Sequence, residues 1–277
     1  MKKILVPVDF SKTSENAFVY ALEMAKSYDA QLLLLHTFEM PFVDNQVVVF
    51  DYSEIYNTLE SINSNQFEEE LTKLQEIAGE HGAEHILINH ILVSGNLVDN
   101  VKEIIKVENI DFVVMGTKGT SDWFSSLMGT NTSDVISDVS IPVLSVSSKA
   151  RFSRLETIGF TTLYREDDLH ALKEVLSLAK RLHAKVKCLY VKTHDSEFKD
   201  QAIRYWENHF KNEKNLDFFI IPNDDVEATI EGFISDQGID LLAMVTHRKN
   251  FFTRFFTTST TQKMSQHSKT PILAIHE

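Results

Sequence analysis

Residues 109–115 read NIDFVVM and residues 238–244 read GIDLLAM, at an offset of 129 residues. The same offset places IPVL at 141–144 on TPIL at 270–273. A chain that resembles itself over such a period is a tandem repeat of one structural unit. The offset also superimposes two apolar sets that share the i, i+4, i+7, i+8 spacing of one helix face, namely Leu97, Val101, Ile104 and Ile105, and Val226, Ile230, Phe233 and Ile234.

Earlier in the chain the two halves match at an offset of 154 residues, where AQLLLLH at 30–36 meets AKVKCLY at 184–190. The larger offset implies an insertion of 25 residues in the first half, between His36 and His81. We expect a loop over 38–51 and then a helix with a buried stripe, formed by Phe67, Leu71, Leu74 and Ala78. The polar segment 147–153 lacks periodicity, and it separates the predicted domains 1–148 and 154–277.

Within each half, short apolar strands alternate with amphipathic helices. The first helix begins after the capping residues 11–14 and has a buried stripe of Ala17, Tyr20, Ala21, Met24 and Ala25. This alternation predicts an α/β protein of two tandem, open, parallel five-stranded sheets flanked by helices, a Rossmann-like arrangement. The first-half strands are expected at about 3–8, 31–36, 86–93, 111–115 and 142–147.

The last strand of each half, 143–146 and 272–275, would be an exposed sheet edge that needs a partner. Pairing of these two strands would make an internal pseudo-dimer. Pairing between chains would make a homodimer.

Composition excludes several classes of protein. The chain has 277 residues, 43% hydrophobic and 24% charged, with a net charge of −13. Residues 1–150 contain 22 acidic and nine basic side chains, whereas residues 151–277 are balanced. An acidic chain is poorly suited to nucleic acid. No apolar run approaches the roughly 20 residues that span a bilayer, so we expect a cytoplasmic protein without a membrane span. The single cysteine, Cys188, excludes a disulfide framework, and its place in a strand predicts a buried, inert thiol.

A glycine-rich segment follows the fourth predicted strand. It reads GTKG at 116–119 and GTNT at 129–132, where the second group opens a predicted helix. Glycine permits close backbone approach, and amides at a helix N-terminus bind anions. The spacing matches neither a Walker loop nor the dinucleotide-binding glycine pattern.

The spacing Gly-x2-Gly-x9-Gly-Thr, the opening ILVPVDFS at 4–11 and the closing PVLSV at 142–146 resemble the universal stress protein family over almost the whole chain. The resemblance implies an adenine nucleotide alpha hydrolase-like fold and ATP, with Mg²⁺, in the first half. Pro7, Val8 and Met115 would line the site, Asp9 would face the ribose or the metal, and Thr37 the base. Phosphates would meet Gly116, Lys118, Gly119, Gly129, Thr130, Asn131 and Thr132, although Asn131 departs from the small apolar residue usual at its position. Lys118, amides and Mg²⁺ would have to offset the net negative charge of this half.

The second half lacks this pattern. Its counterparts of the three glycines are Val245, Arg248 and Thr258, and Leu163 stands in place of Asp9. We therefore predict a degenerate domain that serves packing and interaction. Its segment HRKNFFTRFF at 247–256 could contact a lipid, a partner or an anionic metabolite, or pack on the neighbouring domain.

Two alternative functions stay open. One is a slow ATP hydrolase that uses Asp9 and Mg²⁺. The other is a scaffold that binds a lipid or metabolite instead of a nucleotide. Histidines 81, 85 and 90 are expected on the surface, and Glu68, Glu69 and Glu70 on a solvated helix face.

Overall fold

The structure is a computed structural model that describes residues 1–40, 52–117, 130–196, 200–246 and 269–276. The chain divides into two compact units. The first consists of Met1–Gly116 with Thr130–Val139, and the second contains Ser140–Glu277. The division differs from the sequence repeat in one respect, because the last strand of the first repeat belongs to the second unit.

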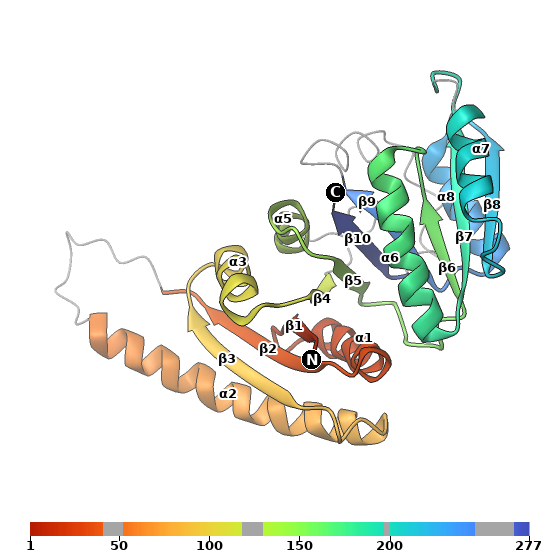
Figure 1. The fold of residues 1–277 in the computed structure, drawn as a ribbon. Helices are drawn as coiled ribbons and strands as arrows, with labels where there is room; N and C mark the ends of the chain where they lie inside the picture. Colours follow the sequence, from red (N-terminus) through yellow and green to blue (C-terminus); the bar gives the residue numbers. More distant parts are fainter. Residues whose placement is uncertain (41–51, 118–129, 197–199, 247–268, 277) are drawn as a thin grey trace, which may run out of the picture. The chain divides into compact units, whose positions relative to one another are not determined.

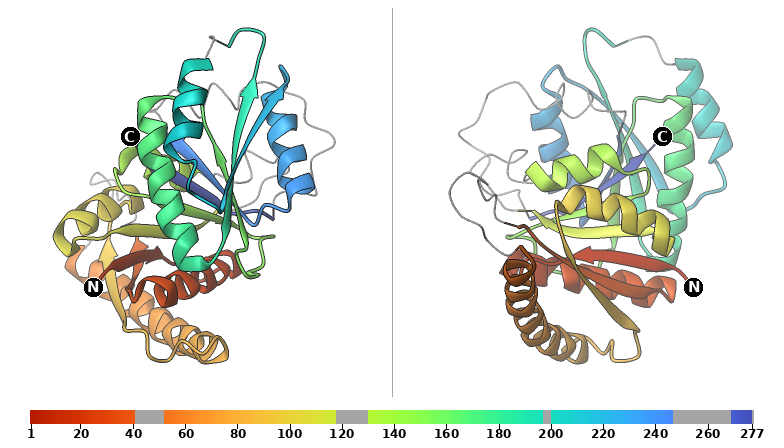
Figure 2. Two further views of the ribbon diagram at one scale, coloured as in Figure 1. Left: turned by 45° about the vertical axis from the view of Figure 1, so that its right-hand side comes forward. Right: turned by 90° about the vertical axis from the view of Figure 1, so that its left-hand side faces the viewer.

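The first unit is a parallel sheet with helices on both faces (Figure 1). Its strands lie in the order β3-β2-β1-β4. Helices α1 and α2 cover one face, and α3 and α5 the other (Figure 2). The elements are β1 (Lys3–Pro7), α1 (Lys12–Tyr28), β2 (Gln31–Phe38), α2 (Tyr52–Glu80), β3 (Ile88–Ser94), α3 (Leu97–Glu108), β4 (Phe112–Thr117) and α5 (Thr130–Asp138).

The predicted apolar stripes form the core of this unit. All five stripe residues of α1 and all four of α2 are buried. Helix α2 is 29 residues long, so much of the predicted insertion is helical. The segment 41–51, most of the predicted loop, lies outside the described residues.

The second unit repeats the same plan with a strand from the first repeat added (Figure 1). Its strands lie in the order β5-β10-β9-β6-β7-β8. Helices α6 and α7 cover one face and α8 the other (Figure 2). The elements are β5 (Val143–Ser147), β6 (Thr157–Thr161), α6 (Glu166–Leu182), β7 (Lys185–Lys192), α7 (Asp200–His209), β8 (Leu216–Pro222), α8 (Val226–Gln237), β9 (Leu241–Thr246) and β10 (Ile272–His276).

The predicted pairing of the two final strands is confirmed. β5 and β10 are antiparallel, with Ser145 opposite Ile272 and Leu144 opposite Leu273. All other strand pairs with a defined register are parallel. The apolar edge of each repeat is therefore covered by the other within one chain. No helix among the described residues is long and apolar enough to cross a bilayer.

Candidate functional site

The candidate site lies at the carboxyl ends of β1, β2 and β4. These three strands are parallel neighbours, so their carboxyl ends meet at one edge of the sheet. Beyond the end of β1, Val8 still pairs with β2, because its amide donates to the carbonyl of Leu35 at 2.8 Å. The carbonyl of Val8 accepts a hydrogen bond from His36 Nδ1, also at 2.8 Å. Hydrogen bonds thus hold both the amide and the carbonyl of Val8, the residue before Asp9.

The chain turns sharply at Phe10, which has φ of 60° although it is not glycine. Such a left-handed conformation costs about 1 kcal/mol. Aromatic contacts offset this cost. The ring of Phe10 lies 4.1 Å from that of His36 between centroids, and 6.0 Å from that of Phe67. These contacts join α2, and therefore the insertion, to the turn that positions Asp9.

Asp9 is exposed at this turn, and its carboxylate is oriented by the start of α1. Oδ1 accepts hydrogen bonds from the amide and the hydroxyl of Ser11. Ser11 in turn caps α1 by accepting from the amide of Ser14 at 3.2 Å. A carboxylate held in this way at the end of a strand can face a sugar hydroxyl or a metal ion.

Gly116, in β4, contacts the first turn of α1. A Cβ added to Gly116 would lie 2.8 Å from the carbonyl oxygen of Thr13. No other residue fits there without a shift of backbone, since real Cβ atoms do not approach so closely. The hydroxyl of Thr132, in α5, lies 3.4 Å from the carbonyl oxygen of Gly116, to which it donates. The missing side chain at Gly116 thus lets β4 approach α1, and a hydrogen bond links β4 to α5 at the same edge.

The structure brings the described members of the predicted site to this edge. Asp9 is exposed, Thr37 is half-buried near the end of β2, and Pro7, Val8 and Met115 are buried, so their side chains belong to the core. Asn131 is exposed and Thr132 buried in the first turn of α5. Lys118, Gly119 and Gly129 lie outside the described residues, as does the side chain of Thr130.

A charged cluster beside this edge was not predicted. Glu15 and Glu70 are both buried, and Lys73 forms an ion pair with Glu15 and lies 3.9 Å from Glu70. Lys12 also pairs with Glu15, at 2.9 Å. The expectation of a solvated face for Glu68–Glu70 is therefore wrong for Glu70. It fails because α1, which supplies Glu15, is far away in the sequence.

The pKa values of the two glutamates in this cluster are shifted in opposite directions. Burial raises the pKa of Glu15, but hydrogen bonds from Lys73 and Lys12 outweigh it, so the pKa is lowered. Burial raises the pKa of Glu70, and this effect outweighs the nearby positive charge of Lys73, which lowers it. Glu70 Oε1 has no hydrogen-bond partner among the described residues.

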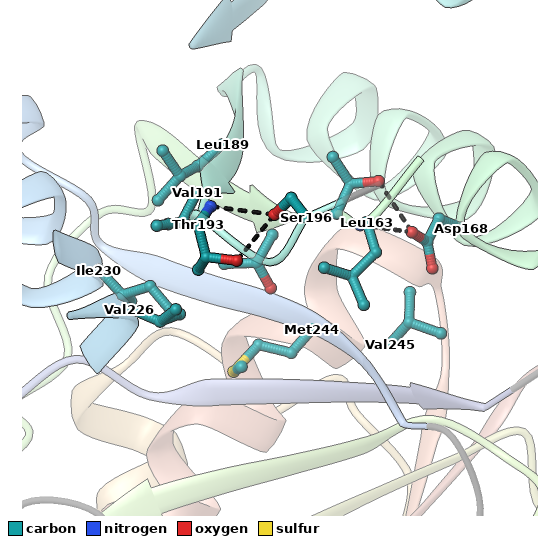
Figure 3. Close-up of a pocket in the computed structure, with 12 residues that line it drawn as sticks. Leu163, Asp168, Leu189, Val191, Thr193, Ser196, Val226, Ile230, Met244 and Val245 are labelled. Carbon is teal, nitrogen blue, oxygen red and sulfur yellow. Dashed lines mark hydrogen bonds between the residues drawn. The ribbon is translucent and has the colours of Figure 1, made fainter. Parts of the chain in front are cut away.

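The corresponding edge of the second unit has different chemistry. The turn after β6 repeats the left-handed conformation at Tyr164, with φ of 55°. Leu163 takes the place of Asp9 and lines a cavity together with Val245, which takes the place of Gly116 (Figure 3). Apolar side chains thus stand at both positions, where the first unit has the carboxylate of Asp9 and the bare backbone of Gly116. Arg248, Thr258 and the segment 247–256 lie outside the described residues.

The cysteine and the histidines considered as candidates make contacts within the fold. Cys188 is fully buried, and burial raises the pKa of its thiol well above the usual value, as expected for an inert cysteine. His81 lies 3.2 Å from a carboxylate oxygen of Glu23, and His90 packs against Phe67. Among the described residues, no group of three potential ligands is placed to hold a metal ion.

Comparison with known proteins agrees with this architecture. The sequence profile of the Universal stress protein family matches residues 1–147 and again 157–276. Universal stress protein MJ0531 of Methanocaldococcus jannaschii is 27% identical over 146 residues, which are 52% of this chain and 81% of that protein. A second protein of that organism, MJ0577, is 26% identical over 53% of this chain and 96% of its own length.

Among solved structures, a universal stress protein from Archaeoglobus fulgidus superimposes with a TM-score of 0.73 at 16% identity. The match covers 99% of this chain and 98% of that one, so it shows the same fold over both repeats. The chain therefore belongs to the universal stress protein family, with two copies of the family domain in tandem.

Proposed function

We propose that the first repeat binds ATP together with Mg²⁺ at the carboxyl edge of β1, β2 and β4, and that the nucleotide regulates a cytoplasmic stress-response protein. The observation that carries the proposal is the convergence at this edge of three features that the family resemblance assigns to nucleotide binding. These are the oriented carboxylate of Asp9, the half-buried hydroxyl of Thr37 and the close backbone approach at Gly116.

Each feature suits one part of the ligand. Asp9 would accept from ribose hydroxyls or hold the metal, and Thr37 would contact the base. The first turn of α5, which contains Thr130 and Asn131, would offer amides to the phosphates, since helix N-termini favour anions. Bound Mg²⁺ would neutralise phosphate charge. Lys118, Gly119 and Gly129 belong to the same proposal.

Because the first half has a net negative charge, we expect ATP binding to require the metal ion. Among the described residues, Lys12 and Lys73 lie beside this edge, and both are already paired with buried Glu15, so they offer little to a phosphate. Polyphosphate would also meet the repulsion of Asp9 and Glu70. We therefore expect ATP without Mg²⁺ to bind at least tenfold more weakly than Mg-ATP.

Calorimetric titration of Mg-ATP tests the proposal. The wild type should bind one equivalent per chain. Asp9→Asn should weaken binding about tenfold or more, because a hydrogen bond to a charged group contributes about 1.5–3 kcal/mol. Thr37→Val should weaken it less, about threefold to tenfold, because that hydroxyl is neutral.

Glu80→Gln is the matched control, because it removes one exposed carboxylate from the last turn of α2, just before β3 begins, at the opposite end of the sheet. Its affinity should equal that of the wild type. The absence of binding by the wild type, or equal affinities of Asp9→Asn and Glu80→Gln, would reject the proposed site. Phosphate release that depends on Asp9 would favour the slow hydrolase instead of a regulatory site.

We assign the second repeat, 154–277, the role of a degenerate interaction domain next to the nucleotide-binding domain 1–148. Support comes from Leu163 and Val245, whose side chains replace an exposed carboxylate and a bare backbone. A titration that finds two equivalents of ATP per chain would reject this division of roles.

A further inference from the structure

The second unit contains a partly open cavity of about 110 Å³ at the carboxyl ends of β6, β7 and β9. Twelve residues line it, all within this unit and all described. Figure 3 shows that the apolar side chains come from several elements. Leu163 lies in the turn after β6, Val191 in β7, Val226 and Ile230 in α8, and Met244 and Val245 in β9.

The one ionisable side chain among the twelve lining residues, Asp168, makes hydrogen bonds within the protein. Asp168 is 1% exposed, and its Oδ2 accepts hydrogen bonds from the hydroxyl of Thr162 and the amides of Leu163 and Arg165. This carboxylate fixes the turn after β6. In the first unit, Asp9 is exposed at the matching turn and is fixed by Ser11. The two repeats therefore hold the same turn with a carboxylate, but only the first exposes it.

A polar pair marks one side of the cavity. The hydroxyls of Thr193 and Ser196 lie 2.8 Å apart, and Ser196 Oγ also accepts from the amide of Thr193 at 2.9 Å. Figure 3 shows both side chains beside the apolar ones. Each hydroxyl has one hydrogen and two acceptor positions, so the pair can still donate one hydrogen bond and accept others.

The described lining favours one class of ligand. None of the twelve described lining residues is basic, so within the described part of the chain a phosphate or carboxylate ligand would meet no counter-charge from the lining. An apolar cavity of roughly 150 Å³ binds benzene, and a cavity of about 110 Å³ therefore suits a single ring or a short aliphatic chain.

We infer that the second unit carries a binding site for a small uncharged molecule, whose apolar part fills the cavity and whose hydroxyl or carbonyl group meets Thr193 and Ser196. This site is separate from the proposed nucleotide site and does not depend on it. The same sheet edge therefore differs between the repeats: it carries an exposed carboxylate in the first and a partly open, mainly apolar cavity in the second.

Methyl NMR spectra of the full chain test the inference, with benzyl alcohol as the probe. Benzyl alcohol has one ring and one hydroxyl, and we expect it to shift the methyl signals of Leu163, Val191 and Ile230 saturably. Benzoate, which adds a negative charge to the same ring, should bind at least tenfold more weakly. A saturating concentration of Mg-ATP should leave the affinity for benzyl alcohol unchanged, because the two sites are independent.

Two substitutions separate the apolar and polar parts of the site. Val226→Trp places a large side chain at a half-buried lining position and should weaken benzyl alcohol binding at least tenfold. Thr193→Val should weaken benzyl alcohol about threefold to tenfold but leave toluene, which lacks the hydroxyl, unchanged. Ile220→Trp, at an exposed position of β8 outside the lining, is the matched control and should bind like the wild type.

Several results would overturn the inference. These are the absence of saturable shifts in the wild type, shifts confined to methyls outside the lining, equal binding of benzoate, displacement of the probe by Mg-ATP, or Val226→Trp binding as tightly as Ile220→Trp. If Val226→Trp does not fold, Leu163→Phe tests the same cavity from the turn after β6. Loss of nucleotide binding alone would reject only the proposed function.

Discussion

At the scale of single residues, Gly116 is the described glycine of the first unit at which an added Cβ would meet the closest atoms. Gly116→Ala should lower the free energy of unfolding by about 1–3 kcal/mol, because the new Cβ would lie 2.8 Å from backbone in α1. Urea unfolding measures this change. Gly232→Ala is the matched control. It lies in α8 with no atom within 4 Å of an added Cβ, so it should be stabilising by about 0.5–1 kcal/mol. Equal effects of the two substitutions would contradict the assigned close approach.

In the charged cluster of α1 and α2, we expect substitution of Glu15 and substitution of Glu70 to have different effects on the free energy of unfolding. At pH 7, Glu15→Gln should lower the free energy of unfolding by about 1–2 kcal/mol, because the lowered pKa of Glu15 reflects ion pairs that stabilise the fold. That stabilisation is present above the unfolded pKa and is lost as the pH falls through the lower folded pKa.

Glu70→Gln should be neutral or stabilising at pH 7, because the raised pKa of Glu70 shows that its charge is unfavourable in the folded state. Chemical unfolding at pH 7 and at pH 4 measures both variants. Destabilisation of equal size by both substitutions at pH 7 would show that the two glutamates are not in different surroundings.

Some of these residues could be predicted from the sequence and others could not. Asp9 and Thr37 could be placed at one edge because each follows or ends a strand, and parallel strands end together. Burial of Glu70 could not be predicted, because it depends on Lys73 meeting Glu15 across two helices. Gly116 was expected to lie close to the phosphates of the nucleotide. Its close approach to Thr13 could not be predicted, because the two residues are far apart in the sequence.

At the scale of elements, a buried glutamate in α8 makes the stability of the fold depend on pH. Burial, and then the charges of Glu227 and Asp225, raise the pKa of Glu231 to about 7. The unfolded chain releases this proton near pH 4.3, so the folded protein holds a proton that the unfolded chain lacks between about pH 4.5 and 7. Stability therefore falls as the pH rises through this window.

Glu231→Gln should remove that dependence and raise the free energy of unfolding at pH 8 by up to about 3 kcal/mol, with little change at pH 4. Urea unfolding at pH 4, 6 and 8 measures the effect. The exposed Glu213→Gln serves as control and should follow the wild type at every pH. A Glu231→Gln curve that keeps the wild-type slope between pH 4.5 and 7 would disprove the assignment.

Most elements of this fold could be predicted, because the spacing of apolar residues along the chain reflects which side chains are buried. The stripes of α1, α2 and α8 face the core, and the short apolar runs are strands covered on both faces. The length of α2, 29 residues, and the cavity of the second unit could not be predicted in this way. A cavity depends on the distance between elements, which a pattern of apolar residues does not contain.

At the scale of the whole molecule, the sequence repeat and the compact units do not coincide, because β5 belongs with β10. The pairing could be predicted from two apolar edge strands that each lack a partner, since exposed edges of this kind associate. Sequence could not decide whether the partner strand comes from the same chain or from a second copy. The structure places both strands of the pair in one chain.

An engineered disulfide tests this pairing in solution. Ser145 and Ile272 are directly opposite in the antiparallel pair, so their Cα atoms should lie about 4.5–5.5 Å apart, within the range of a disulfide. Ser145→Cys with Ile272→Cys should therefore form a disulfide under mild oxidation, and the product should migrate as a monomer on a non-reducing gel. Ser147→Cys with Ile272→Cys is displaced by two residues, about 7–8 Å, and should remain reduced. The native Cys188 is buried and should not interfere. Covalent dimers from the first variant would show that the edges pair between chains.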